Sequence, residues 1–133
     1  MRRIPEYQTL LSASATDVSA GFSVSDYRNC VLAITGSATS ANLKVFILGA
    51  IGDTVPDFDI NKDARTATDN WDFIEAVDLE DGAAIDGDTG ISLSGNVVRL
   101  IEVNVNSLDW LAVNVTNVIS GTVTVKAAFT TNE

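Results

Sequence analysis

The chain has 133 residues, of which 46% are hydrophobic and 20% are charged, a composition typical of one globular domain with its own core. Its net charge of −10 disfavours binding to nucleic acids and to anionic membrane surfaces. The sequence contains no histidine, which excludes catalytic triads and zinc sites that depend on histidine, and we expect no enzymatic activity.

Residues 1–20 differ in composition from the rest of the chain. Pro5 precedes a short run from Tyr7 to Leu11 that ends in two leucines, and a stretch rich in Ser, Ala and Thr follows. This pattern predicts an N-terminal arm or an edge strand, attached to a β-domain of residues 21–133. An arm would add a strand to the sheet of a neighbouring subunit. In the alternative, residues 1–20 form the first strands of their own domain.

The N-terminal segment offers an apolar anchor and a basic pair for such a contact. Leu10 or Leu11 would fill a pocket on the neighbour, and Arg2 with Arg3 would meet an acidic surface. The candidate interface residues are Arg2, Arg3, Tyr7, Leu10, Leu11 and Trp71. No apolar stretch follows the basic pair, so it does not predict a signal peptide, and we expect synthesis in a host cytoplasm.

Alternation of apolar and polar residues predicts β-strands along most of the chain, separated by turns rich in Gly, Asn and Ser. The predicted strands span residues 7–13, 18–24, 29–35, 42–50, 71–79, 90–94, 97–105, 109–118 and 121–130. No substantial helix is predicted. Many short strands without a helix indicate an all-β fold, an antiparallel β-sandwich of jelly-roll or immunoglobulin-like type.

The same alternation predicts which side chains form the core. Predicted core residues are Val97, Ile101, Val103, Val113, Val115, Val123 and Val125. Cys30 also lies in an apolar run, and we expect it to be a small core residue rather than a reactive thiol.

The segment from Asp53 to Asn70 is acidic and irregular, and segments of this length are usually functional or bound to a partner. It places oxygen-bearing side chains at alternate positions, as a calcium-binding loop does. The candidate calcium ligands are Asp57, Asp59, Asn61 and Asp63. However, Lys62 stands where such a loop needs glycine, so a plain loop or short edge strand is the alternative. No other cofactor is expected.

Aromatic side chains in or near loops suggest a carbohydrate-binding platform as a second class of function. Trp71, Trp110, Tyr7 and Tyr27 are the candidates. Trp110 lies in an alternating run and is expected in the core. Trp71 follows a polar loop, so it could pin that loop or meet a neighbouring subunit.

Several short strings of the sequence carry a resemblance to a known group of proteins. They are Phe22–Tyr27, Pro56–Phe58, Asn70–Ile74, Val77–Gly82, Ile85–Ile91 and Val98–Asn104. In these strings the chain resembles small β-sandwich proteins of tailed-phage virions, of the capsid auxiliary or decoration type and the head-fibre type. The resemblance implies a structural role on a capsid, contact with other virion proteins and a symmetric homo-oligomer, for which we expect a trimer.

We therefore expect a non-enzymatic structural component of a virion. It would pack on a capsid surface, where it stabilises the capsid or serves for display. A carbohydrate- or receptor-binding β-sandwich module is the alternative. Glycoside hydrolysis by two carboxylates is the enzymatic alternative, but acidic residues in glycine-rich turns mostly form turns.

Overall fold

The computed structural model describes residues 3–37, 42–59, 61, 63, 65–66, 69–93 and 98–132. Within these ranges the chain forms twelve β-strands and no α-helix. They are β1 (Arg3–Ala13), β2 (Asp17–Val18), β3 (Phe22–Ser23), β4 (Asn29–Gly36), β5 (Lys44–Ala50), β6 (Trp71–Phe73), β7 (Ala76–Asp78), β8 (Ala84–Ile85), β9 (Ile91–Ser92), β10 (Val98–Asn104), β11 (Trp110–Thr116) and β12 (Val123–Asn132). Accordingly, the described part of the chain holds no helix able to cross a membrane.

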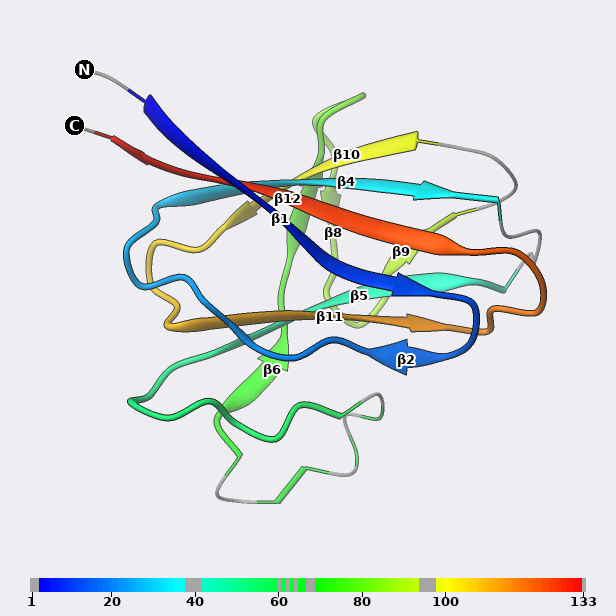
Figure 1. Ribbon diagram of the computed structural model, residues 1–133, viewed down its shortest axis with the longest axis horizontal. Coiled ribbons are helices and arrows are strands. Elements are labelled where there is room, and N and C mark those ends of the chain that lie inside the picture. The colour runs from blue at the N-terminus through cyan, green and yellow to red at the C-terminus, as the bar shows by residue number, and fades with distance from the viewer. Residues whose placement is uncertain are drawn as a thin grey trace.

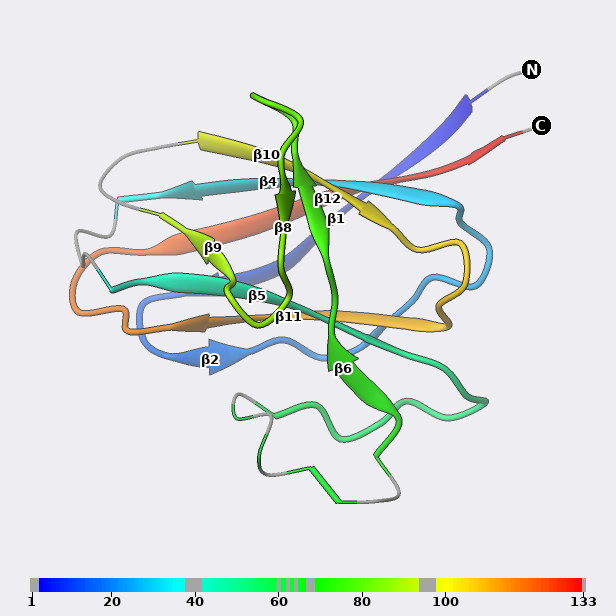
Figure 2. The ribbon, with the colours of Figure 1, turned by 180° about the vertical axis from the view of Figure 1, so that it is seen from behind.

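The strands form two antiparallel sheets, which confirms the predicted all-β sandwich (Figure 1). The first sheet has the order β1-β12-β4-β10-β7-β8. The second has the order β2-β11-β5-β6, with β3 also paired to β11 and β9 to β5. Strands β7 and β8 run across the direction of the longer strands at one edge of the sandwich (Figure 2).

The core lies between the two sheets and is lined by alternate residues of the long strands. Six predicted core residues are 0% exposed, which confirms the alternation: Ile101, Val103, Val113, Val115, Val123 and Val125. The seventh, Val97, lies outside the described residues. Burial of a valine side chain contributes about 1.5 kcal/mol or more to stability. Cys30 is also in this core, and burial raises the pKa of its thiol to about 12.

Two predicted strands are divided in the structure. The predicted strand 71–79 separates into β6 in the second sheet and β7 in the first, because the chain crosses between the sheets near Ile74. The Ile74 amide still donates to the Ile47 carbonyl of the second sheet at 2.8 Å. The predicted strand 18–24 likewise separates into β2 and β3. Between them, Ser19 exchanges two hydrogen bonds with the Val113 main chain.

Strand β1 is the edge strand of the first sheet and pairs with β12 of the same chain, from Arg3 opposite Asn132 to Ala13 opposite Val123. A β-bulge at Leu10 shifts the register. Leu10 and Leu11 are both buried in the core of their own domain. Strand β2 then joins the second sheet, so residues 3–18 contribute to both sheets of this chain.

Arg99 interrupts the apolar alternation of β10, and an ion pair explains its position. Its guanidinium binds the Asp78 carboxylate of β7 and donates to the Ser92 carbonyl of β9 at 2.8 Å. The Glu80 amide donates to Asp78 Oδ1 at 3.0 Å. The Glu80 amide first, and then Arg99, lowers the pKa of Asp78 below its ordinary value. The pair thus links three strands near the edge of the sandwich.

Replacing Val103 by aspartate should bury an unpaired carboxylate, because Val103 is 0% exposed. We expect Val103→Asp to lower the free energy of unfolding by about 4 kcal/mol or more. Val98→Asp is the matched control, since Val98 lies on the same strand and is 68% exposed; its effect should stay within about 0.5 kcal/mol. Denaturant unfolding followed by circular dichroism measures both, and equal losses would contradict the burial pattern.

Asp78 should make stability depend on acid pH. Its folded-state pKa is lowered, so its contribution is complete above the ordinary carboxyl pKa of about 4 and is lost as the pH falls through the lower folded-state value. We expect Asp78→Asn to lower the melting temperature at pH 7 and to reduce the further loss below about pH 4. Thermal melts across this range test it against Asp53→Asn, an exposed acid. Parallel pH curves for Asp78→Asn and wild type would contradict the assignment.

Candidate interaction surface

The two outer faces of the sandwich differ in what covers them. The outer face of the second sheet is covered by the chain itself, through Phe58 from the acidic segment and Trp71 from β6. Their rings lie 5.9 Å apart, centre to centre, and Trp71 is only 2% exposed. Together with three residues of the sheet they form a second, smaller core. The sheet residues are Leu48, Ala50 and Ala112.

Trp71 is the residue that fastens the acidic segment to the sheet. Its indole Nε1 donates to the Asp57 carbonyl at 3.2 Å. Arg65 lies over the indole ring, 5.2 Å from its centre, and donates to the Trp71 carbonyl at 2.6 Å. Arg65 also pairs with Asp72 at 3.2 Å. Of the two roles predicted for Trp71, the structure shows this loop-pinning contact.

The candidate calcium ligands lie in this segment, and their oxygens make local turns. Asp59 Oδ1 accepts the amide of Asn61 at 3.0 Å, and Asn61 Oδ1 accepts the amide of Asp63 at 2.9 Å. Asp57 is exposed, and its carbonyl accepts from the Trp71 indole. Among the described residues, no three or more Asp, Glu or Cys side chains gather closely enough to hold a metal ion. The calcium site stays a prediction.

The outer face of the first sheet is built from the half-exposed and exposed positions of β1, β12, β4 and β10. The register places two rows of side chains across these strands. One row is Thr9, Lys126, Ala33 and Leu100. The next row is Tyr7, Ala128, Val31 and Glu102. The centre of the face therefore carries small and apolar side chains.

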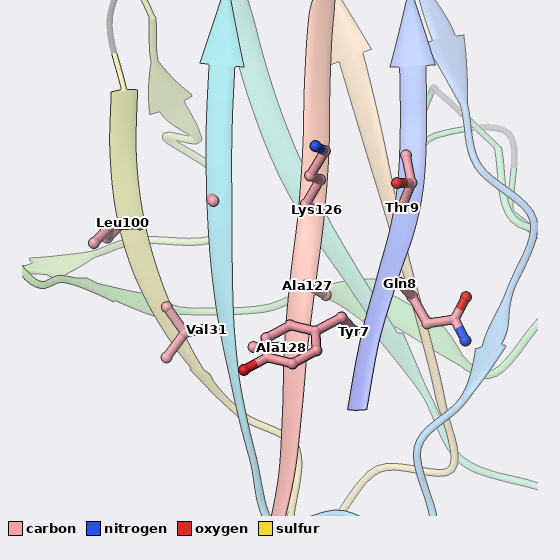
Figure 3. Close-up of a pocket in the computed structure, with 9 residues that line it drawn as sticks. Tyr7, Gln8, Thr9, Val31, Leu100, Lys126, Ala127 and Ala128 are labelled. Atoms are coloured by element: carbon pink, nitrogen blue, oxygen red, sulfur yellow. The ribbon is translucent and has the colours of Figure 1, made fainter. Parts of the chain in front are cut away.

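These rows enclose a hollow of ≈ 500 Å³ (Figure 3). Ala33 and Ala128 form a low floor, because their side chains end at Cβ. Tyr7 and Leu100, which are 73% and 48% exposed, stand at the two sides. Figure 3 shows the Tyr7 ring lying across β12 beside Ala128, with Val31 and Leu100 on the β4 and β10 side.

The apolar surface continues past the hollow. Leu79 and Val98 are exposed beside Leu100, and the Leu79 amide donates to the Leu100 carbonyl at 3.0 Å. These three side chains line a second hollow of ≈ 280 Å³ together with the charged residues Asp78, Glu80 and Arg99. Exposed apolar side chains that lie together make this part of the surface a candidate for interaction with another molecule. We call the outer face of β1, β12, β4 and β10 the bare face.

The bare face is also nearly neutral, in a chain whose net charge is −10. Lys126 and Glu102 are the charged side chains among its described outward positions. Glu102 accepts a hydrogen bond from Asn29 Nδ2 at 3.0 Å. Lys126 has no ion-pair partner within the described ranges. The face therefore presents one unpaired cation and one carboxylate on an apolar background.

Most of the residues of the bare face were not among the predicted interface residues. Tyr7 was a predicted interface residue, and it lies on the bare face. The predicted interface residues Leu10, Leu11 and Trp71 are instead buried within this chain. The side chain of Arg3, and all of Arg2, lie outside the described part. The sequence contains one signal for this face, the run Cys30–Ile34. It is apolar at every position, a pattern that indicates burial on both faces of a strand.

The remaining aromatic candidates for sugar binding are turned toward the protein. Trp110 is partly buried, and its Nε1 donates to the Gly52 carbonyl at 3.0 Å. Tyr27 stacks on Phe129 at 5.1 Å and donates to the Glu6 carboxylate. That hydrogen bond, more than any other cause, raises the pKa of Tyr27 to about 12. Among the aromatic candidates, Tyr7 is the exposed one.

Comparison with known proteins identifies the fold. No family model and no curated protein matches the sequence. Among solved structures, the chain is similar to the SPBc2 prophage-derived protein YomS, with a TM-score of 0.71 and 14% sequence identity. The match covers 98% of this chain and 96% of that one. The two proteins therefore share one fold over nearly the whole of both chains.

Because the oxygens of Asp59 and Asn61 already accept main-chain amides, we expect EDTA to leave the melting temperature unchanged. Asp59→Ala should lower the free energy of unfolding by about 1 kcal/mol or less, through loss of one turn hydrogen bond. Asp53→Ala, an exposed acid of the same segment, is the control. Differential scanning fluorimetry with and without calcium measures the shift. A melting temperature that EDTA lowers, and that Asp59→Ala makes insensitive to EDTA, would establish the calcium site.

Proposed function

We propose that this protein is a non-enzymatic structural component of a tailed-phage particle that packs on the capsid surface. The observation that carries the proposal is the likeness of the whole chain to a prophage-derived protein, with 98% and 96% of the two chains aligned. The sequence resemblance to small virion β-sandwich proteins points in the same direction. Such a protein would be made in the host cytoplasm and reside in the virion.

The chemistry of the described surface supports a packing role rather than catalysis. The sequence has no histidine to act as a general base. Acidic side chains are used in turns: Asp86 Oδ1 accepts the Asp88 amide at 2.8 Å, and Asp81 Oδ1 accepts the Ala83 amide at 2.9 Å. The hollow of ≈ 500 Å³ on the bare face is lined mainly by apolar side chains, which suits contact with another protein.

The proposed partners are capsid or other virion proteins, together with further copies of this chain as a homo-oligomer. Arg2 and Arg3 are the proposed contact with an acidic surface of the particle, a contact that should weaken with salt. The alternative, a carbohydrate- or receptor-binding module, has less support because Trp71 is buried and Trp110 is turned toward Gly52.

The test is the composition of the particle. Virions purified from the phage or prophage that encodes this chain should contain it in a fixed molar ratio to the major capsid protein, measured by quantitative mass spectrometry. Its absence from purified particles, with the protein present in the infected cell, would contradict the proposal.

Attachment is tested by adding the purified chain to particles that lack it. Arg2→Ser with Arg3→Ser should reduce co-sedimentation, and the reduction should shrink at high salt because the wild-type contact is then screened. Substitution is preferable to deletion of the N-terminal segment, because deletion of residues 1–12 would remove most of β1 and the buried Leu10 and Leu11. The control is Lys44→Ser, a basic residue of the second sheet. Equal losses in both variants would contradict the N-terminal contact.

A further inference from the structure

We propose that the free edge of β1 receives an extended segment of a partner polypeptide, which adds to the first sheet as a further strand. The free edge is the side of β1 that faces away from β12. The inference rests on the proposed function, because under that function the segment belongs to another protein of the particle. It is carried by main-chain groups of Tyr7 and Thr9 that point out of the sheet.

Hydrogen bonds at both ends of β12 show which of its residues bond to β4. Main-chain groups of successive strand residues point to opposite sides of the strand. The Thr122 carbonyl accepts from the Ser37 amide at 3.0 Å, and the Thr130 carbonyl accepts from the Arg28 amide at 3.0 Å. Even-numbered residues of β12 therefore bond to β4, and its odd-numbered residues bond to β1.

The same alternation continues into β1. Gln8 lies opposite the odd-numbered Ala127, so the Gln8 amide and carbonyl bond to β12. Tyr7 and Thr9, on either side of it, lie opposite even-numbered residues, and their amides and carbonyls point away from β12. Within the described ranges, no group pairs with these two amides and two carbonyls.

Pro5 and the β-bulge at Leu10 bound this open stretch of the edge. Edge strands are commonly protected from pairing by lysine, proline or a bulge. Pro5 lies in the same outward register as Tyr7 and has no amide to donate, and the bulge bends the strand after Thr9. Between them, residues 6–9 carry no such protection, and all four residues are exposed. The edge is therefore open at Tyr7 and Thr9 and closed on either side.

The neighbouring side chains leave the open stretch clear. Figure 3 shows the Tyr7 ring lying across β12 beside Ala128, away from the free edge. The Gln8 side chain extends to the other side of β1, where its carboxamide can bond to an added strand. Glu6 is held by the Tyr27 hydroxyl. Strand β1 also ends the strand order of the first sheet and lies on the near side of the sandwich in Figure 1.

An extended polypeptide is the occupant that these groups select. The outward groups of Tyr7 and Thr9 repeat after two residues, about 7 Å along the strand. An extended main chain presents its own donors and acceptors at the same spacing, so it pairs with all four groups. A second folded copy fits less well, because it brings its own Pro5 and bulge to the contact and a like net charge of −10. A separate segment brings neither.

Amide hydrogen exchange of the full-length chain tests the open edge directly. In the free chain, the amides of Tyr7 and Thr9 should exchange rapidly, and that of Gln8 slowly, because only the Gln8 amide bonds to β12. After binding to purified particles that lack the protein, the Tyr7 and Thr9 amides should become protected. Exchange that stays rapid at both amides in the bound chain would overturn the proposal.

Proline substitution tests whether the main chain makes the contact. Thr9→Pro removes an amide that points outward and leaves the bonds to β12 intact; Pro5 already occupies the same register. We expect co-sedimentation with the particles to fall about tenfold or more. Thr9→Ala is the matched control, since it keeps the amide, and its binding should stay within about twofold of wild type.

Circular dichroism melts check the fold of each variant, and Tyr7→Pro, in the same outward register, serves if Thr9→Pro unfolds. If both unfold, hydrogen exchange of the wild type decides. Wild-type chain that does not bind particles contradicts the proposed function, and this inference with it. Wild type and a folded proline variant that bind equally overturn the inference alone. Equal losses in Thr9→Ala and Thr9→Pro would assign the contact to the side chain. A dimer of the free chain in sedimentation velocity that Thr9→Pro abolishes would make a second copy the occupant. Either result overturns the proposal.

Discussion

Strand β4 fixes the register of the first sheet, because it pairs along its length with β12 on one side and over Asn29–Thr35 with β10 on the other. Side chains alternate along a strand, so a shift by one residue would exchange its two faces. The observed register turns Leu32 and Ile34 into the core and leaves Val31 and Ala33 on the outside. The same constraint that builds the core therefore also builds the bare face, and neither can change without the other.

The outer face of the second sheet also carries apolar side chains, and the acidic segment of the same chain covers them. Phe58 and Trp71 cover the sheet, while the carboxylates between them point to water and cap turns. The alternation of acidic and apolar residues that resembled a calcium loop is thus satisfied by a different arrangement. Apolar residues anchor the segment, and polar residues shape its backbone. The first sheet has no such segment within the described residues, which leaves its outer face available to another molecule.

The sequence predicted the fold and the inner core well, because period-two alternation in β10, β11 and β12 reports directly on one buried face. It did not predict the division of 71–79 between two sheets, since the crossing near Ile74 is set by tertiary hydrogen bonding rather than by local composition. It also missed most of the bare face. That face brings together residues of four strands far apart in the chain, and single-strand patterns carry no information on which strands become neighbours.

The low charge of the bare face sets it apart in a chain whose net charge is −10. Two chains of charge −10 repel each other over most orientations, and this repulsion opposes unselective association through exposed residues such as Ile51 or Ile119. Only an approach that brings neutral surfaces together avoids placing like charges opposite each other. The bare face provides such a surface, because Lys126 and Glu102 are the charged side chains among its described outward positions.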